Sequence, residues 1–312
     1  MLGKTAGGLY WMSRYLERSE NTARLVEAGQ RIALTRSSAD DEWVSVLQTA
    51  AVLSGYRQKY AEVTREQAID WMLRDRDNPS SVLSVAESAR NNARVVRTAL
   101  TREVWEAVNE CWMVLKQALA RRVIERDLPQ VLGTIRQRNA FVRGAMHGTM
   151  LRNDIYNFVR IGTFIERSDN TARILDVKYY ILLPSAMAVG SNLDTAQWES
   201  ILRSVSGEGG FQMTYGQQVR PREIAQFLIL DKRMPRSLSF CADKLRDNLA
   251  YLSEDYGTRL PSRDLADALC ARFLSCPIEA IFDFGLHEFI QDYLRATAAL
   301  GRQTEVDYRF YE

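Results

Sequence analysis

The sequence is short of several residue types, and each shortage excludes a class of protein. Histidine occurs twice, and the four cysteines lack the spacing of a zinc site or a secreted disulfide scaffold. Lys and Arg total 41 against 39 Asp and Glu, so a net charge of +2 gives no field for a nucleic acid or an anionic membrane. No uncharged apolar run reaches the roughly 18 residues of a membrane span. We therefore expect neither nucleic acid nor membrane as a partner.

The sequence also lacks the usual signals for secretion and for cofactor binding. The segment from Met1 to Gly8 has one lysine and small residues but no apolar signal-peptide core, so we expect a cytoplasmic protein. Gly3-Lys4-Thr5 cannot have the earlier glycine of a phosphate-binding loop. Gly207-Glu208-Gly209-Gly210 follows no strand signal, and we interpret it as a loop. We expect no cofactor and no metal.

What the sequence does contain is helical periodicity over nearly its whole length. Only seven prolines interrupt it, and strand signals are almost absent. The long stretch 129–182 should break at Gly144, Gly148 and Asn153. These observations predict an all-α fold. Apolar residues recur at three- and four-residue spacing in segments 9–35, 40–54, 64–74, 80–100, 102–122, 129–182, 195–205, 221–230, 236–253, 263–274 and 278–300.

A nine-residue motif occurs twice in the chain. Residues 17–25 read ERSENTARL and residues 166–174 read ERSDNTARI, so seven of nine positions are identical. Weaker matches follow, among them Trp43 with Trp198, Pro79 with Pro235 and Ser81 with Ser237. We therefore predict a helical bundle that arose by tandem duplication, with pseudo-twofold halves that share one core. The first repeat would be 1–126 and the second 127–312, in which a long helical connection, 127–182, carries the second motif.

The polar residues of the motif are the candidate site residues. Most paired positions outside the motif have diverged, whereas these polar side chains are the same in both copies, which solvated helix faces do not usually show. Acid–base spacing of four residues, as in Glu20 with Arg24 and Asp169 with Arg173, is explained by ordinary helix-surface pairing. The candidates are Glu17, Arg18, Asn21, Thr22 and Arg24 in the first copy and Glu166, Arg167, Asn170, Thr171 and Arg173 in the second.

Three interpretations of the Glu-Arg motif are open. Its charges could be buried and paired between the halves, or the arginines could bind a carboxylate or phosphate that Asn and Thr orient. The third interpretation is a catalytic acid or base at Glu17 or Glu166, although no His or Cys stands near either motif in sequence.

Helical geometry makes the first interpretation specific. Glu17 and Arg18 are neighbours that point about 100° apart, so they cannot pair with each other. Two related halves docked about a twofold axis pair reciprocally. We therefore predict Glu17 near Arg167 and Arg18 near Glu166, with Asn21 and Asn170 in the next turn. The alternative is pairing within each half, of Glu17 with Arg90 or Arg94 and of Glu166 with Arg246.

The twin motifs, Glu17-Arg18 and Glu166-Arg167, in a tandem all-helical chain resemble the bacterial alpha-E family. The resemblance covers essentially the whole chain. It implies a genomic setting more than a chemistry, since genes of the family tend to lie beside circularly permuted ATP-grasp ligases, transglutaminase-like peptidases and a proteasome-like hydrolase. It supplies no established catalytic residues.

The sequence and this resemblance together favour a non-catalytic or accessory helical protein of a bacterial peptide synthesis or modification system. Its partner would be an ATP-grasp-type ligase or the peptide substrate of that ligase, with a transglutaminase-like peptidase or a proteasome-like hydrolase as other partners. One alternative is an enzyme whose Glu- and Arg-lined cleft forms or breaks an amide bond. The other is a purely structural, oligomerising protein.

Overall fold

The computed structural model describes residues 3–33, 39–181, 192–274 and 276–312. These residues form fifteen α-helices, two 3₁₀ turns and no strand, which confirms the all-α prediction. The helices are α1 (Gly3–Ala33), α2 (Ala39–Thr49), α3 (Leu53–Lys59), α4 (Arg65–Leu73), α5 (Val82–Val95), α6 (Arg102–Ala118), α7 (Leu128–Thr149), α8 (Asp154–Ile181), α9 (Asn192–Ser204), α10 (Glu208–Tyr215), α11 (Pro221–Ile229), α12 (Leu238–Tyr256), α13 (Pro261–Ala271), α14 (Ile278–Phe284) and α15 (Leu286–Asp307).

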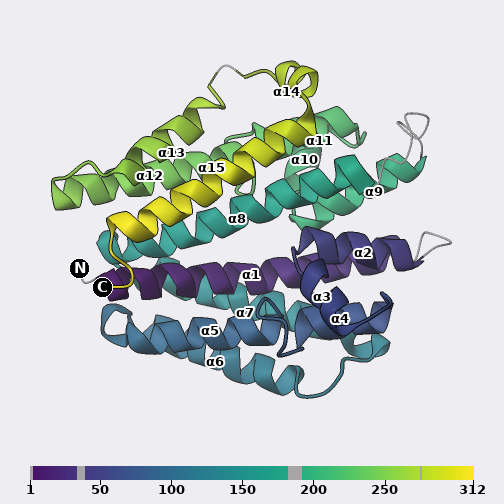
Figure 1. The fold of residues 1–312 in the computed structure, drawn as a ribbon, viewed down its shortest axis with the longest axis horizontal. Helices are drawn as coiled ribbons and strands as arrows, with labels where there is room; N and C mark the ends of the chain where they lie inside the picture. Colours follow the sequence, from purple (N-terminus) through teal and green to yellow (C-terminus); the bar gives the residue numbers. More distant parts are fainter. Residues whose placement is uncertain (1–2, 34–38, 182–191, 275) are drawn as a thin grey trace.

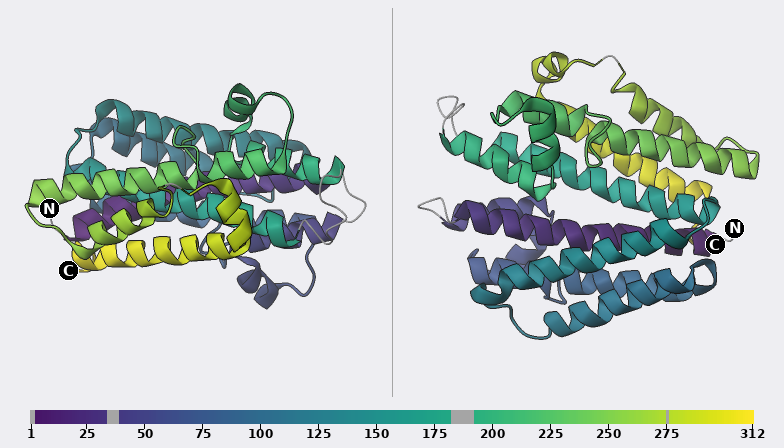
Figure 2. Two further views of the ribbon diagram at one scale, coloured as in Figure 1. Left: turned by 90° about the horizontal axis from the view of Figure 1, so that it is seen from above. Right: turned by 180° about the vertical axis from the view of Figure 1, so that it is seen from behind.

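The two long motif helices, α1 and α8, lie side by side in the middle of the molecule (Figure 1). On one side α5, α6 and α7 pack together with α1, and on the other α12, α13 and α15 pack together with α8 (Figures 1 and 2). The two chain ends lie at the same end of the bundle. The motif is thus carried by the two helices that join the halves.

The second half repeats the order of helices in the first. Short helices follow each motif helix, and then a long helix begins after a serine N-cap, Ser81 before α5 and Ser237 before α12. Such an order is what the predicted duplication requires, and the duplication itself stays a prediction. Helix α7 packs on α1 and α6, and the boundary between 126 and 127 likewise stays a prediction.

Three sequence-based helix assignments need correction. The predicted long connection 127–182 is two helices that separate at residues 150–153, which confirms the break at Asn153, whereas the breaks predicted at Gly144 and Gly148 are wrong because both glycines lie inside α7. The predicted loop at Gly207–Gly210 is wrong, because α10 begins at Glu208. The single helix predicted over 278–300 is broken at Gly285, whose φ of 110° is a conformation that side chains rarely adopt.

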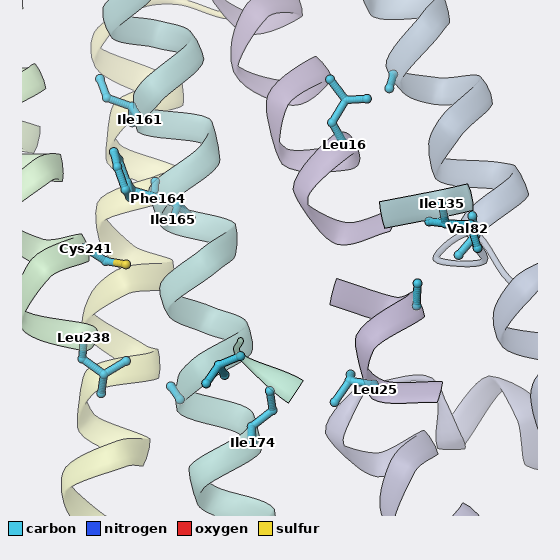
Figure 3. Packing of buried hydrophobic residues seen from close by; sticks show 14 of the residues in the cluster. Leu16, Leu25, Val82, Ile135, Ile161, Phe164, Ile165, Ile174, Leu238 and Cys241 are labelled. Carbon is cyan, nitrogen blue, oxygen red and sulfur yellow. The ribbon is translucent and has the colours of Figure 1, made fainter. Parts of the chain in front are cut away.

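Buried apolar side chains from both halves form one cluster around the central helices. Figure 3 shows Ile161 and Phe164 of α8 near Cys241 of α12, while Leu16 of α1 lies on the side of Val82 and Ile135. A Cβ atom at Gly162 would lie 2.3 Å from the carbonyl oxygen of Tyr10, so only glycine lets α8 approach α1 this closely. None of the helices in the described parts of the chain combines the length and apolar character that a membrane span requires.

Candidate functional site: two sites at the motif helices

The motif charges pair between the halves, as predicted. Nε and Nη2 of Arg167 each donate to an oxygen of Glu17 over 3.0 Å. Reciprocally, Arg18 donates from Nε to Oε1 of Glu166 over 2.5 Å and from Nη2 to Oε2 over 3.0 Å. Both arrangements are bidentate, the strongest form of guanidinium–carboxylate hydrogen bonding.

The alternative pairing within each half is wrong. Arg90 donates to Asn109, and Arg246 pairs with Asp243 and Asp247. The ordinary helix-surface pairs do form, from Arg24 to Glu20 and from Arg173 to Asp169.

The first-copy acids lie in what we call the closed site, formed by Glu17, Glu20, Arg143, Arg167 and Arg236. Arg236 reaches Glu17 over 2.9 Å and Glu20 over 3.2 Å, and Arg143 donates to the second oxygen of Glu20. Glu20 is 0% exposed and Arg236 is 7% exposed. Protein guanidiniums thus occupy this site completely.

The second-copy acids lie in what we call the open site, formed by Arg14, Arg18, Glu166, Asp169 and Arg173. Arg14 of α1 adds a third hydrogen bond to Glu166, from Nε to Oε2 over 3.0 Å. Arg173 holds Asp169 through two hydrogen bonds of 2.7 and 3.2 Å. All five residues line a cleft of about 400 Å³.

The cleft is open because two positions that hold arginines at the closed site hold small residues at the equivalent places around the open site. Arg236 immediately precedes the N-cap of α12, and Ser80 immediately precedes the N-cap of α5. Arg143 and Gly301 are each the sixteenth residue of a 22-residue helix, α7 and α15. Ser80 and Gly301 both line the cleft. Where the closed site holds two guanidiniums, the open site therefore holds space.

The remaining Asn and Thr residues of the motif lie at or between the two sites. Oδ1 of Asn21 accepts a hydrogen bond of 2.9 Å from Arg236, and Thr171 donates to the carbonyl oxygen of Arg167 over 3.2 Å. Thr22 and Asn170 line the cleft, as does Asn21. The buried Nδ2 atoms of Asn21 and Asn170 have no acceptor within the described residues. The asparagine amides that recur in both copies are thus the motif's unsatisfied donors.

The pairing fixes the charge state of the motif acids. Burial alone would raise the pKa of Glu166, but the charges and hydrogen bonds of Arg18 and Arg14 outweigh burial and lower the pKa. The pKa of Glu17 is lowered in the same way against burial, by Arg167 and Arg236. A general base works best with a pKa near the operating pH, so these carboxylates are poorly suited to accept protons.

Three of the cysteines are poor nucleophiles, and both histidines have polar partners. Burial raises the pKa of the thiols of Cys111, Cys241 and Cys270 to about 12, which leaves each as the weakly nucleophilic thiol. His147 contacts Tyr156 and Arg160, and His287 contacts Asp176. Among the described residues, no cluster of three or more His, Cys, Asp or Glu side chains is placed to hold a metal.

Sequence reasoning found both reciprocal pairs but missed Arg14, Glu20, Arg143 and Arg236 as members of the sites. Arg236 stood beside the matched pair Ser81 and Ser237, and its replacement by Ser80 in the first half was a visible signal. Arg143 had no such signal, because it depends on how α7 docks against α1.

Comparison with known proteins agrees with the motif and with its helical setting. Uncharacterised proteins of Mycobacterium bovis and of two Mycobacterium tuberculosis strains are 26% identical over 324 residues, which include 93% of this chain. The chain spans only 34% of the length of these relatives. No solved structure matches it. The Alpha-E family model, described as a predicted alpha-helical domain with a conserved ER motif, matches residues 1–308, and the chain therefore belongs to the Alpha-E family.

Proposed function

We propose that the chain is a non-catalytic, accessory helical protein of a bacterial peptide synthesis or modification system in the cytoplasm. It binds an ATP-grasp-type ligase or the peptide on which that ligase acts. The observation that carries this proposal is the saturation of the motif acids. Glu17 and Glu166 are each paired with two arginines, so the motif supplies a rigid, charged binding surface and not a free acid or base.

The size of the relatives supports a role beside other protein domains. Each relative continues for about twice the matched length again, since this chain covers 34% of it. In those proteins the helical unit is joined to further chain. An accessory unit that works next to a second activity fits this arrangement.

The enzyme alternative requires a proton-accepting group in the cleft. The acid at the centre of the open site is Glu166, whose pKa the neighbouring arginines lower despite burial. Burial raises the pKa of the thiols of Cys111 and Cys241, so these groups are also poor candidates for a base or nucleophile. Both observations favour the accessory role over the enzyme.

The experiment is affinity capture of the tagged full chain from its native bacterium, followed by a ligase assay. We expect recovery of an ATP-grasp ligase, and a rise in its rate when the chain is added. Purified chain alone should hydrolyse neither ATP nor peptides. Turnover by the purified chain that Glu166→Gln abolishes would overturn the proposal in favour of an enzyme.

A further inference from the structure

The floor of the open-site cleft carries hydrogen-bond donors that lack acceptors. Arg236 is a donor only, so its bond to Oδ1 of Asn21 fixes that amide and leaves Nδ2 without an acceptor among the described residues. The Nδ2 atom of Asn170 is in the same state. Both residues are at least nine-tenths buried and line the cleft. Buried polar groups normally have partners, so these amides indicate a ligand with acceptor atoms.

Charged donors surround the same space. Arg18 uses its Nε and Nη2 atoms on Glu166, which leaves Nη1 for another acceptor. Arg302 of α15 lines the cleft, is exposed and has no salt bridge to any described residue. An acceptor group in the cleft would therefore meet guanidinium donors as well as amide donors.

The balance of charge selects the kind of anion. The cleft is lined by four arginines (Arg14, Arg18, Arg173, Arg302) and three acids (Glu166, Asp169, Glu305), a formal excess of one positive charge. A carboxylate carries a single negative charge, whereas a phosphate group carries about 1.5 to 2 at neutral pH. The excess matches a carboxylate.

The size and the apolar walls indicate what bears that carboxylate. A volume of about 400 Å³ is at the small end of the range for ligand pockets. Trp11, Leu25, Val52 and Met72 line the walls, where they can contact an apolar group or a peptide backbone.

We propose that the open-site cleft binds the free carboxylate of an amino acid or of a peptide C-terminus. The ligand carboxylate accepts hydrogen bonds from Asn21, Asn170 and the guanidiniums of Arg18 and Arg302. This inference rests on the proposed function and names the part of the peptide substrate that the chain holds. The closed site cannot do the same, because Arg143 and Arg236 fill the corresponding space.

The test is calorimetric titration of the purified full chain with a set of glycyl dipeptides of all side-chain types and with their C-terminal amides. We expect at least one free dipeptide to bind, and its amide to bind about tenfold or more weakly, because charge-assisted hydrogen bonds are lost. Inorganic phosphate serves as the competing anion. Absence of binding by every dipeptide, equal binding of the amides, or binding of phosphate alone would each overturn the proposal.

Two variants place the binding in the cleft. Ser80→Arg copies the arginine of the closed site and should abolish binding, while Ser80→Ala keeps the cleft open and should bind as the wild type does. Arg302→Gln should weaken binding about tenfold. Arg295→Gln, on the same helix but outside the cleft, should not. Unchanged binding in both folded Ser80→Arg and Arg302→Gln would contradict the assignment. The titration needs no ligase, so its failure is separate from failure of the capture experiment.

Discussion

The closed and open sites begin from the same motif and differ in what surrounds it. At the closed site Glu17 and Glu20 are held by arginines from three other helices or loops. At the open site Glu166 is held by Arg14 and Arg18, both from α1, and the cleft adjoins it. The closed site is part of the core, and the open site adjoins a cleft.

This difference shows that burial of the motif charges and binding by the motif are compatible. Replacing a buried ion pair by apolar residues is often neutral or stabilising, so stability alone does not explain why the paired charges are there. In this molecule the closed site fixes how α1 packs against α8, and that packing positions Arg18 and Asn170 at the cleft. A structural role of the motif at the closed site is therefore compatible with a binding role at the open site.

Acidification should have the largest effect on stability, because it acts on both sites. Glu17, Glu20 and Glu166 all have pKa values lowered by arginines despite burial. Their stabilisation is fully present above the unfolded-state pKa of about 4.3 and is lost as pH falls through the lower folded-state pKa, because the unfolded chain then binds more protons. Urea unfolding at a series of pH values from neutral to acid measures this loss.

The same series of urea unfolding experiments, carried out on a variant, distinguishes the two sites. Glu166→Gln removes the carboxylate of the open site only, so most of the pH dependence should remain from Glu17 and Glu20. A wild-type free energy of unfolding that stays constant over the acid range would show that neither site is coupled to folding.

The next largest effect is expected for Arg167→Ala at the closed site. This change leaves Glu17, which is 3% exposed, without its bidentate partner and should cost about 3 to 5 kcal/mol. Thermal and urea unfolding measure the loss. The matched control is Arg173→Ala, which breaks a half-buried surface pair and should cost about 0.5 kcal/mol or less. Equal losses in the two variants would place the closed site outside the structural core.

A smaller loss is expected for Arg18→Ala, the counterpart of that change at the open site. Each variant leaves its acid one arginine, Arg14 for Glu166 and Arg236 for Glu17. Only at the open site could water in the cleft replace the missing donors. We expect about 1 to 2 kcal/mol, measured by the same unfolding experiments. A loss as large as that of Arg167→Ala would mean that the open site is as rigidly structural as the closed one.

Sequence reasoning reached the fold class from local periodicity, and it reached the reciprocal pairs from the repeated motif and the twofold docking that a repeat favours. Helical periodicity locates the elements, and the angle between Glu17 and Arg18 excludes pairing between neighbours. The prediction of a loop at Gly207–Gly210 is wrong, because a glycine-rich segment begins a helix there and packing outweighs its weak helix propensity.

The difference between the two sites could not be predicted from the motif. It arises from Ser80 and Gly301, residues that match no motif position and matter only because α5 and α15 bring them to the cleft. A Cβ atom at Gly301 would lie 3.2 Å from the hydroxyl of Tyr10, so a larger side chain there would press on that hydroxyl and fill part of the cleft. The space in the open site is thus a tertiary property that only the docking of the helices reveals.

The smallest effect on stability is expected for Arg302→Gln, which changes an arginine that we propose contacts the ligand at the open site. Arg302 is exposed, has no salt bridge within the described residues and lies in the interior of α15, where glutamine is an equally good helix former. The free energy of unfolding should change by less than about 0.5 kcal/mol, which urea unfolding can measure beside Arg295→Gln as the control. A destabilisation as large as that of Arg18→Ala would show that Arg302 supports the fold. The combination of intact stability with weakened dipeptide binding is what separates a residue kept for a ligand from one kept for packing.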